Sequence, residues 1–166
     1  MKTLKRVLIA RVILIAIPLV VALFVKKEYT VEREVTINKS KQNVFNYVRY
    51  LKNQDNYNKW VQMDPNMKKQ FRGRDGEVGF VYAWDGNDKA GKGEQEIKNI
   101  SEGASVDVEI RFVKPFESIA TAPIVTEAVS ENQTKVKWAM NGKSPYPLNF
   151  MNLFMDNMLG TDMETS

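Results

Sequence analysis

The sequence predicts an α+β fold in which a curved antiparallel sheet of about seven strands surrounds a C-terminal helix. Three observations indicate this fold. An alternating strand is followed by short amphipathic helices, a long run of strands comes next, and an apolar helical segment closes the chain. A further apolar helix precedes this order at the N-terminus.

The N-terminal segment from Val7 to Val25 contains one charged residue, Arg11, and one proline. As a helix it would extend roughly 28 Å, close to the ~30 Å hydrocarbon core of a bilayer. Lys2, Lys5 and Arg6 precede it, which favours a cytoplasmic N-terminus.

We therefore expect residues 1–27 to form a signal-anchor that crosses the cytoplasmic membrane once. Residues 28–166 would then be a single domain on the extracytoplasmic side. A cleaved secretory signal is the alternative, because the apolar run 12–25 follows a basic start. No clear small-x-small cleavage site follows this run, which favours the uncleaved anchor.

Composition excludes several classes of function. Four of the 24 Lys and Arg residues precede residue 12, and the remaining 20 balance the 20 Asp and Glu residues. A nucleic-acid partner is therefore not expected, since such binding needs a basic surplus on the folded domain. The chain has no cysteine and no histidine. This excludes disulfides, Ser-His-Asp and Cys-His nucleophiles and the commonest zinc ligands, so we expect no metal and no cofactor.

The folded part begins with an alternating strand, Tyr29–Ile37. A capped amphipathic helix over Lys41–Leu51 and a weaker turn over Asn56–Val61 follow. Alternation and turn residues then predict strands over Lys68–Arg72, Val78–Trp84, Glu94–Ile100, Val106–Phe112, Glu117–Val129 and Lys135–Met140. Pro123 indicates an edge or a bulge in the fifth of these strands. The methionine-rich stretch Leu148–Met158 predicts the closing helix.

The opening pattern resembles that of the START-like, or SRPBCC, superfamily, since Val31, Arg33, Val35 and Ile37 precede Val44-Phe45 and Val48. Later stretches are similar to its polyketide cyclase/dehydrase and lipid-transport group: Trp60–Pro65, Gly79–Trp84, Gly91–Gln95 and Arg111–Phe116. The resemblance covers Tyr29 to about Asp162 and implies a helix-grip fold. Members close with a longer helix than this chain has, which suggests that the C-terminal helix is truncated.

The resemblance implies a cavity between the concave sheet and the closing helix. Aromatic and apolar residues on one face of the predicted strands would line it, with Trp60 at its mouth and Arg33 available to a carboxylate head-group. The candidate ligand-binding residues are Trp60, Phe80, Tyr82, Trp84, Val108, Ile110, Phe112, Trp138, Met140, Phe154, Met158 and Arg33. The alternative is a packed core in which the same side chains fill the space.

Catalysis would need titratable groups in this cavity, but alternation places Glu94, Glu96, Asp107 and Glu109 on the opposite face. Tyr82 is the chief polar exception, and no catalytic residue is assigned. The leading hypothesis is a membrane-tethered module that binds a hydrophobic small molecule or lipid. The alternatives are an enzyme similar to polyketide cyclases or dehydratases, and a non-catalytic scaffold with a filled core and an open face on Leu148–Met158.

Overall fold

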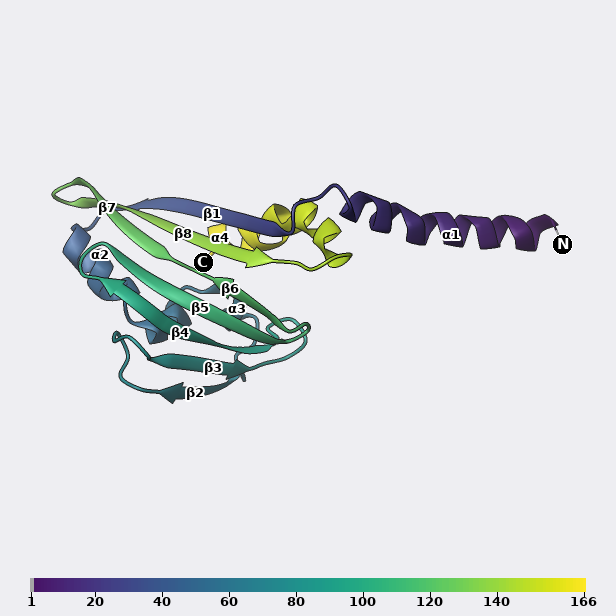
Figure 1. The fold of residues 1–166 in the computed structure, drawn as a ribbon. Coiled ribbons are helices and arrows are strands. Elements are labelled where there is room, and N and C mark those ends of the chain that lie inside the picture. The colour runs from purple at the N-terminus through teal and green to yellow at the C-terminus, as the bar shows by residue number, and fades with distance from the viewer. Residues whose placement is uncertain (1) are drawn as a thin grey trace.

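A computed structural model describes residues 2–166, and eight strands in it form one antiparallel sheet (Figure 1). The order across the sheet is β1-β8-β6-β5-β4-β3-β2, and β7 pairs with both β5 and β8. The strands are β1 (Glu28–Ile37), β2 (Lys68–Arg72), β3 (Val81–Asp85), β4 (Lys92–Ser101), β5 (Ser105–Lys114), β6 (Ser118–Thr121), β7 (Ile124–Ser130) and β8 (Gln133–Lys143). The predicted antiparallel pairing is confirmed.

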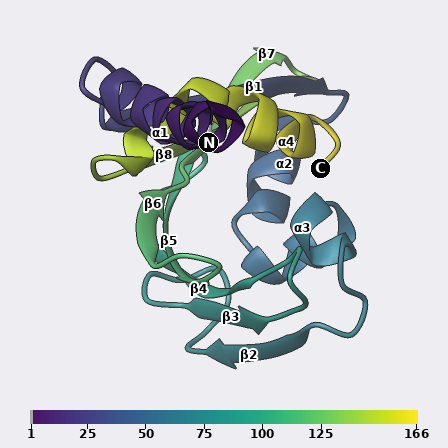
Figure 2. The same ribbon diagram turned by 90° about the vertical axis from the view of Figure 1, so that its right-hand side faces the viewer.

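Helical segments cover the concave side of the sheet (Figure 2). Three of them follow β1: α2 (Lys41–Val48), the 3-10 helix η1 (Leu51–Asn56) and α3 (Lys59–Gln62). The chain closes with a 3-10 segment η2 (Leu148–Phe154), a π segment η3 (Asp156–Gly160) and α4 (Thr161–Glu164). The predicted closing helix is therefore present, but it is irregular and continues beyond Met158.

The strand expected over Glu117–Val129 is two strands, because the ladder breaks at Ala122-Pro123. Proline has no amide hydrogen to donate to a neighbouring strand. Before the break β6 pairs with β5 and β8, and after it β7 continues along β8. Alternation continues across the break, so Ala122 is buried like Ala120 before it and Ile124 after it.

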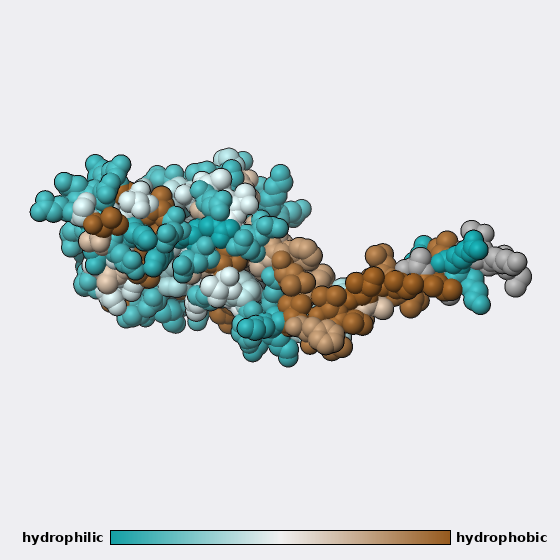
Figure 3. All heavy atoms as spheres, turned by 90° about the horizontal axis from the view of Figure 1, so that it is seen from above, coloured by the Kyte–Doolittle hydropathy of each residue, from teal (hydrophilic) through white to brown (hydrophobic). Residues whose placement is uncertain are grey.

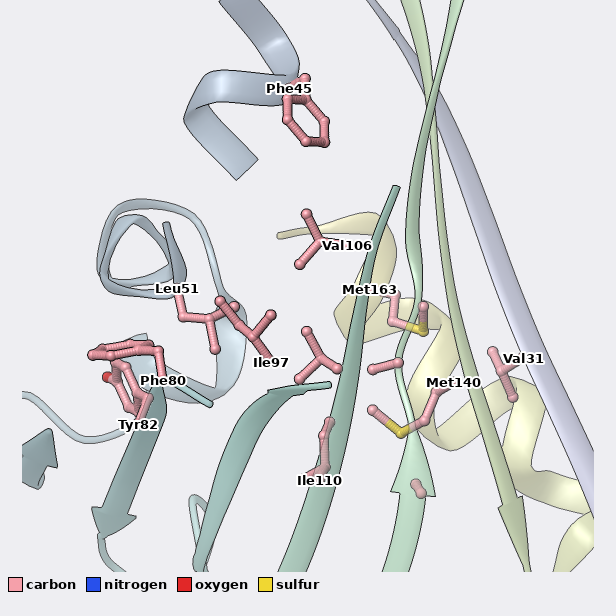
Figure 4. Packing of buried hydrophobic residues seen from close by; sticks show 13 residues of the cluster. Val31, Phe45, Leu51, Phe80, Tyr82, Ile97, Val106, Ile110, Met140 and Met163 are labelled. Atoms are coloured by element: carbon pink, nitrogen blue, oxygen red, sulfur yellow. The ribbon is translucent and has the colours of Figure 1, made fainter. Parts of the chain in front are cut away.

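The core lies between the sheet and the helical segments (Figure 4). Phe45 of α2 and Leu51 of η1 are fully buried and pack with Ile97 and Val106 from the sheet. Burial of one such side chain contributes roughly 1.5–3 kcal/mol. These contacts hold α2 and the start of η1 against the sheet at one end of its concave face.

The N-terminal helix α1 (Lys2–Ala22) extends away from the globular part (Figure 1). It ends at Ala22, three residues before the end of the apolar segment, so its apolar part from Val7 spans only about 24 Å at 1.5 Å per residue. Within residues 2–166, no helix is long and apolar enough to cross a membrane. The expected transmembrane helix is therefore not found.

Two asparagines of η2 join the end of α1 to the domain. The Asn149 side chain donates to the carbonyl oxygens of Ala22 and Val25, both at 2.7 Å. Asn152 donates to the carbonyl oxygens of Lys26 and Lys27, both at 2.9 Å. The Ala22 carbonyl is one of those that a helix end leaves without a partner, and the other three belong to the link that follows α1. The C-terminal end of α1 is thus fixed to the closing segment.

Arg111 is at the centre of a charge cluster on the outer face of the sheet. Its guanidinium binds Glu94 and Glu96 at 2.8 Å each, and it also pairs with Glu109. Bonds from Arg72 and Arg111 lower the pKa of Glu94 below its usual value, although burial acts in the opposite direction, and bonds from Arg111 and Lys98 lower the pKa of Glu96. The carboxylates are therefore ionised and paired well into the acidic range.

These pKa shifts predict how stability depends on pH. Because the two carboxyl groups have lower pKa values in the folded chain, their contribution is complete above about pH 4.5 and is lost as the pH falls through the folded values. We expect Arg111→Met to lower the free energy of unfolding at pH 7 by about 1–2 kcal/mol. The variant should also lose less stability than the wild type between pH 5 and pH 3.

Urea unfolding at a series of pH values measures this difference. Arg74→Met is the matched control, because Arg74 is mostly exposed and pairs only with Glu77 in the described chain. Parallel stability profiles for wild type and Arg111→Met across the acidic range would contradict the assignment.

Candidate functional site

A cavity lies between the concave face of the sheet and the helical segments. Its empty volume is about 740 Å³, including the mouth that opens to solvent. The volume that compares with known ligand sites is about 110 Å³, which is smaller than the about 300–1,000 Å³ of sites for drug-sized ligands. We call this space the first cavity, and its lining residues are Gln54, Asn58, Trp60, Val61, Met67, Tyr82, Trp84, Ala90, Gln95, Val108, Ile110, Phe112, Ala122, Ile124, Trp138, Met140 and Leu159.

Eight of the twelve candidate residues line the first cavity: Trp60, Tyr82, Trp84, Val108, Ile110, Phe112, Trp138 and Met140. The other four lie elsewhere. Phe80 is fully buried in the core and stacks on Phe71. Phe154 and Met158 point outward, with about half of each side chain exposed. Arg33 borders a different cavity on the β1 side.

Aromatic side chains define the shape of the first cavity. The Trp60 and Trp138 rings meet edge to face at a centroid distance of 6.0 Å, and Trp84 meets Phe112 in the same way at 6.1 Å. The Trp84 indole nitrogen donates to the Ala90 carbonyl oxygen at 3.1 Å, which fixes that ring. These rings come from α3, β3, β5 and β8, so both ends of the curved sheet contribute to the wall.

Three buried amides form the polar part of the wall: Gln54 of η1, Asn58 at the N-cap of α3, and Gln95 of β4. We call them the amide cluster. The Gln54 Oε1 atom accepts from Gln95 Nε2 at 2.9 Å and from Asn58 Nδ2 at 3.2 Å. Asn58 Oδ1 accepts from the Trp60 backbone N–H and so caps α3. Hydrogen bonds thereby join the helical side of the cavity to the sheet.

The sequence contains a weak signal for this cluster. Gln95 alternates with Gly93 and Ile97 on the inward face of β4, and all three are buried. A glutamine at an inward strand position is a buried polar group that needs partners. Gln54 lies in an Asn- and Asp-rich stretch that is typical of a loop between helices, so the surrounding sequence does not indicate that its side chain is buried.

Tyr82 is the one titratable residue among the described residues that line the first cavity, and its hydroxyl already donates a hydrogen bond within the protein. It donates to Asp55 Oδ1 at 2.7 Å, and Asp55 in turn pairs with Lys69 at 2.8 Å. Burial, and then the Asp55 carboxylate, raises the pKa of Tyr82 far above its usual value. The tyrosine therefore stays neutral and cannot give up its proton near neutral pH.

A second cavity lies behind Trp138 and Ile124, which border both spaces. Its volume is about 360 Å³, larger than the 110 Å³ of the first cavity, and β1, α2 and the C-terminal residues surround it. Arg33 at its edge donates to Glu164 at 2.6 Å and to Asp156 at 2.8 Å. The guanidinium thus ties α4 and η3 to β1. Within residues 2–166, no group of acidic side chains could hold a metal ion.

No protein-family model matches this chain, and a search of curated proteins finds no similar sequence. Solved structures do match. Truncated norcoclaurine synthase from Thalictrum flavum superposes with a TM-score of 0.64 at 10% identity, over 83% of this chain and 90% of that one. The same enzyme in complex with dopamine and hydroxybenzaldehyde gives 0.63 at 10% identity, over 82% of each chain.

Ginseng major latex-like protein 151 from Panax ginseng superposes with a TM-score of 0.54 at 14% identity, over 84% of this chain and 98% of that one. Identities this low establish the fold alone. The order of elements and the curved sheet with its closing helix are those of the helix-grip fold, so the expected START-like fold is confirmed.

The contact between Gly160 and Arg33 yields a second prediction. A Cβ at Gly160 would overlap with the Arg33 guanidinium and displace it from its carboxylate partners. The Gly160 backbone is otherwise ordinary helix, where alanine is favoured over glycine by about 1 kcal/mol. We expect Gly160→Ala to leave the free energy of unfolding of the wild type unchanged. In an Arg33→Ala background, the same substitution should raise the free energy of unfolding by about 1 kcal/mol.

A double-mutant cycle measured by urea unfolding tests this coupling, with circular dichroism as the readout. The coupling between the two positions should be about 1 kcal/mol. An equal stability gain from Gly160→Ala in both backgrounds would show that the two residues do not interact.

Proposed function

We propose that this protein binds a hydrophobic small molecule or lipid in the first cavity and performs no covalent chemistry on it. The observation that carries the proposal is the lining, in which three tryptophans and several aliphatic side chains face empty space. Large apolar side chains that face a cavity, with a few polar groups among them, are typical of small-molecule sites. The norcoclaurine synthase complex with dopamine and hydroxybenzaldehyde supports it, since a protein of the same fold holds small aromatic molecules.

The alternative of an enzyme similar to polyketide cyclases needs at least two polar groups that converge in the cavity. The amide cluster supplies that number. However, primary amides neither accept nor release protons near neutral pH, and Tyr82 keeps its proton. The chemistry available to the described lining is therefore hydrogen bonding, which favours binding over catalysis.

A cavity-filling substitution tests the binding proposal in the full-length chain. Ala122 and Ala120 are both buried in the core, but only Ala122 also lines the first cavity. We expect Ala122→Leu to keep the melting temperature and to weaken binding of N-phenyl-1-naphthylamine by about tenfold, or ~1.4 kcal/mol. The matched variant Ala120→Leu should instead lower stability by about 1–3 kcal/mol, because it overpacks the core.

Energy transfer from tryptophan to the bound probe measures the affinity. The chain has three tryptophans, and all of them line the first cavity, so transfer reports on that site. A probe that fails to bind the wild type, or that binds Ala122→Leu equally well, would contradict the proposal. A loss of stability in Ala122→Leu equal to that in Ala120→Leu would indicate a filled interior.

We further propose that the apolar segment 7–25, which extends beyond the end of α1, holds the domain at the cytoplasmic membrane with the globular part on the extracytoplasmic side. Supporting features are the exposed apolar side chains of α1 beside the hydrophilic domain surface (Figure 3) and the cations that precede them. The closing segment adds Leu153, Phe154 and Met158, each more than half exposed. Exposed apolar surface on this scale is typical of an interaction site.

Fractionation of a bacterial host that expresses the full chain tests this location. We expect the wild type in the membrane pellet, released by detergent but not by salt, and cleaved by trypsin added to intact spheroplasts. The variant Ile13→Asp/Ile17→Asp should be about tenfold depleted from the pellet, since each buried charge costs several kcal/mol. Val35→Asp, at an equally exposed position on β1, is the control. Wild-type protein in the soluble fraction, or protected from trypsin, would contradict the proposal.

A further inference from the structure

The lining of the first cavity contains polar side chains but no charged ones. Within residues 2–166, no Asp, Glu, Lys or Arg side chain lines the first cavity. Asp55, which approaches through Tyr82, is paired with Lys69. Arg33 borders the second cavity and is paired with two carboxylates. A ligand anion in the first cavity would therefore be buried without a counter-charge, which is strongly unfavourable.

In the amide cluster, one nitrogen atom and one oxygen atom make no hydrogen bond within the described chain. Gln54 is 3% exposed and Gln95 is 7% exposed, and both line the cavity. Gln54 Oε1 and Gln95 Nε2 are used in the bond between them. Within the described chain, the remaining atoms, Gln54 Nε2 and Gln95 Oε1, have no hydrogen-bond partner. Neither atom is among the fully enclosed side-chain atoms that lack a partner in the described chain, so both face space that water or a ligand can reach. A ligand head that bonds to both atoms replaces water there, whereas a ligand that displaces the water without bonding to them incurs a cost of about 1–3 kcal/mol.

We propose that the first cavity selects an uncharged amphipathic ligand whose head is a neutral hydrogen-bonding group, such as a primary amide or a hydroxyl. Gln54 Nε2 would donate to the head and Gln95 Oε1 would accept from it, while the tryptophan-lined wall surrounds the apolar body. The inference rests on the proposed binding function and adds the class of ligand. It departs from the expectation that Arg33 meets a carboxylate head-group.

Three ligands that share one apolar body test this selectivity in the full-length chain: 6-phenylhexanamide, 6-phenylhexanoate and hexylbenzene. Tryptophan emission excited at a wavelength that the phenyl group does not absorb reports binding, since all three tryptophans line the site. We expect the amide to bind about 100-fold more tightly than the carboxylate, and about tenfold more tightly than hexylbenzene.

Gln95→Leu removes the free acceptor, and we expect it to bind the amide about tenfold more weakly while hexylbenzene binding stays within about twofold. Gln70→Leu is the matched control, because Gln70 is an exposed amide on the outer strand β2. If Gln95→Leu does not fold, the ligand series on the wild-type protein still decides the question.

The outcomes separate the two proposals. If the carboxylate binds as tightly as the amide, or if the amide and hexylbenzene bind with equal affinity, the proposed ligand class is wrong. The proposed binding function would remain in either case. Unchanged amide binding by a folded Gln95→Leu variant would overturn the role of the amide cluster, and would indicate that water satisfies it. If none of the three ligands changes the emission, the binding function itself fails.

Discussion

The hollow interior of this domain depends on hydrogen bonds that hold η1 at a fixed distance from the sheet. Gln54 is bonded to Gln95, and Asp55 to Tyr82, so each link runs from a helical side chain to a strand side chain. Apolar contact alone would draw the helical layer onto the sheet until side chains filled the space. A hydrogen bond instead has a preferred length, so these links set the height of the cavity. The aromatic wall consequently remains uncovered beside them.

The same sheet separates two electrostatic environments. Its outer face has ion pairs centred on Arg111, while the residues that line the first cavity are neutral. This division follows from strand alternation, since Gln95 points inward between Glu94 and Glu96, which point outward. Solved structures with the same fold share 9–16% identity with this chain, so the fold alone does not determine the ligand. The ligand class must come from the side chains that this chain places in its own cavity.

Period-two alternation was sufficient to predict the strands and most of the cavity wall, such as Tyr82, Ile110 and Trp138. It could not predict the Gln54–Gln95 bond, because the partners are far apart in sequence and Gln54 lies in a polar stretch. Phe154 and Met158 were expected inward on the assumption of a regular α-helix, but 3-10 and π turns rotate side chains to other directions. The membrane-spanning helix was predicted from the length of the apolar run and the cations before it, which do not indicate that α1 ends at Ala22.

Whether the space beneath the helical segments is hollow can be measured most directly with xenon, which enters dry apolar cavities. Crystals of the full-length chain pressurised with xenon should show anomalous density between Trp60, Trp138 and Met140, with the surrounding side chains unmoved. Density for a bound molecule that excludes xenon from the same place would also agree with a ligand site. A native interior in which the tryptophan side chains fill the space, with neither xenon nor ligand between them, would contradict the account.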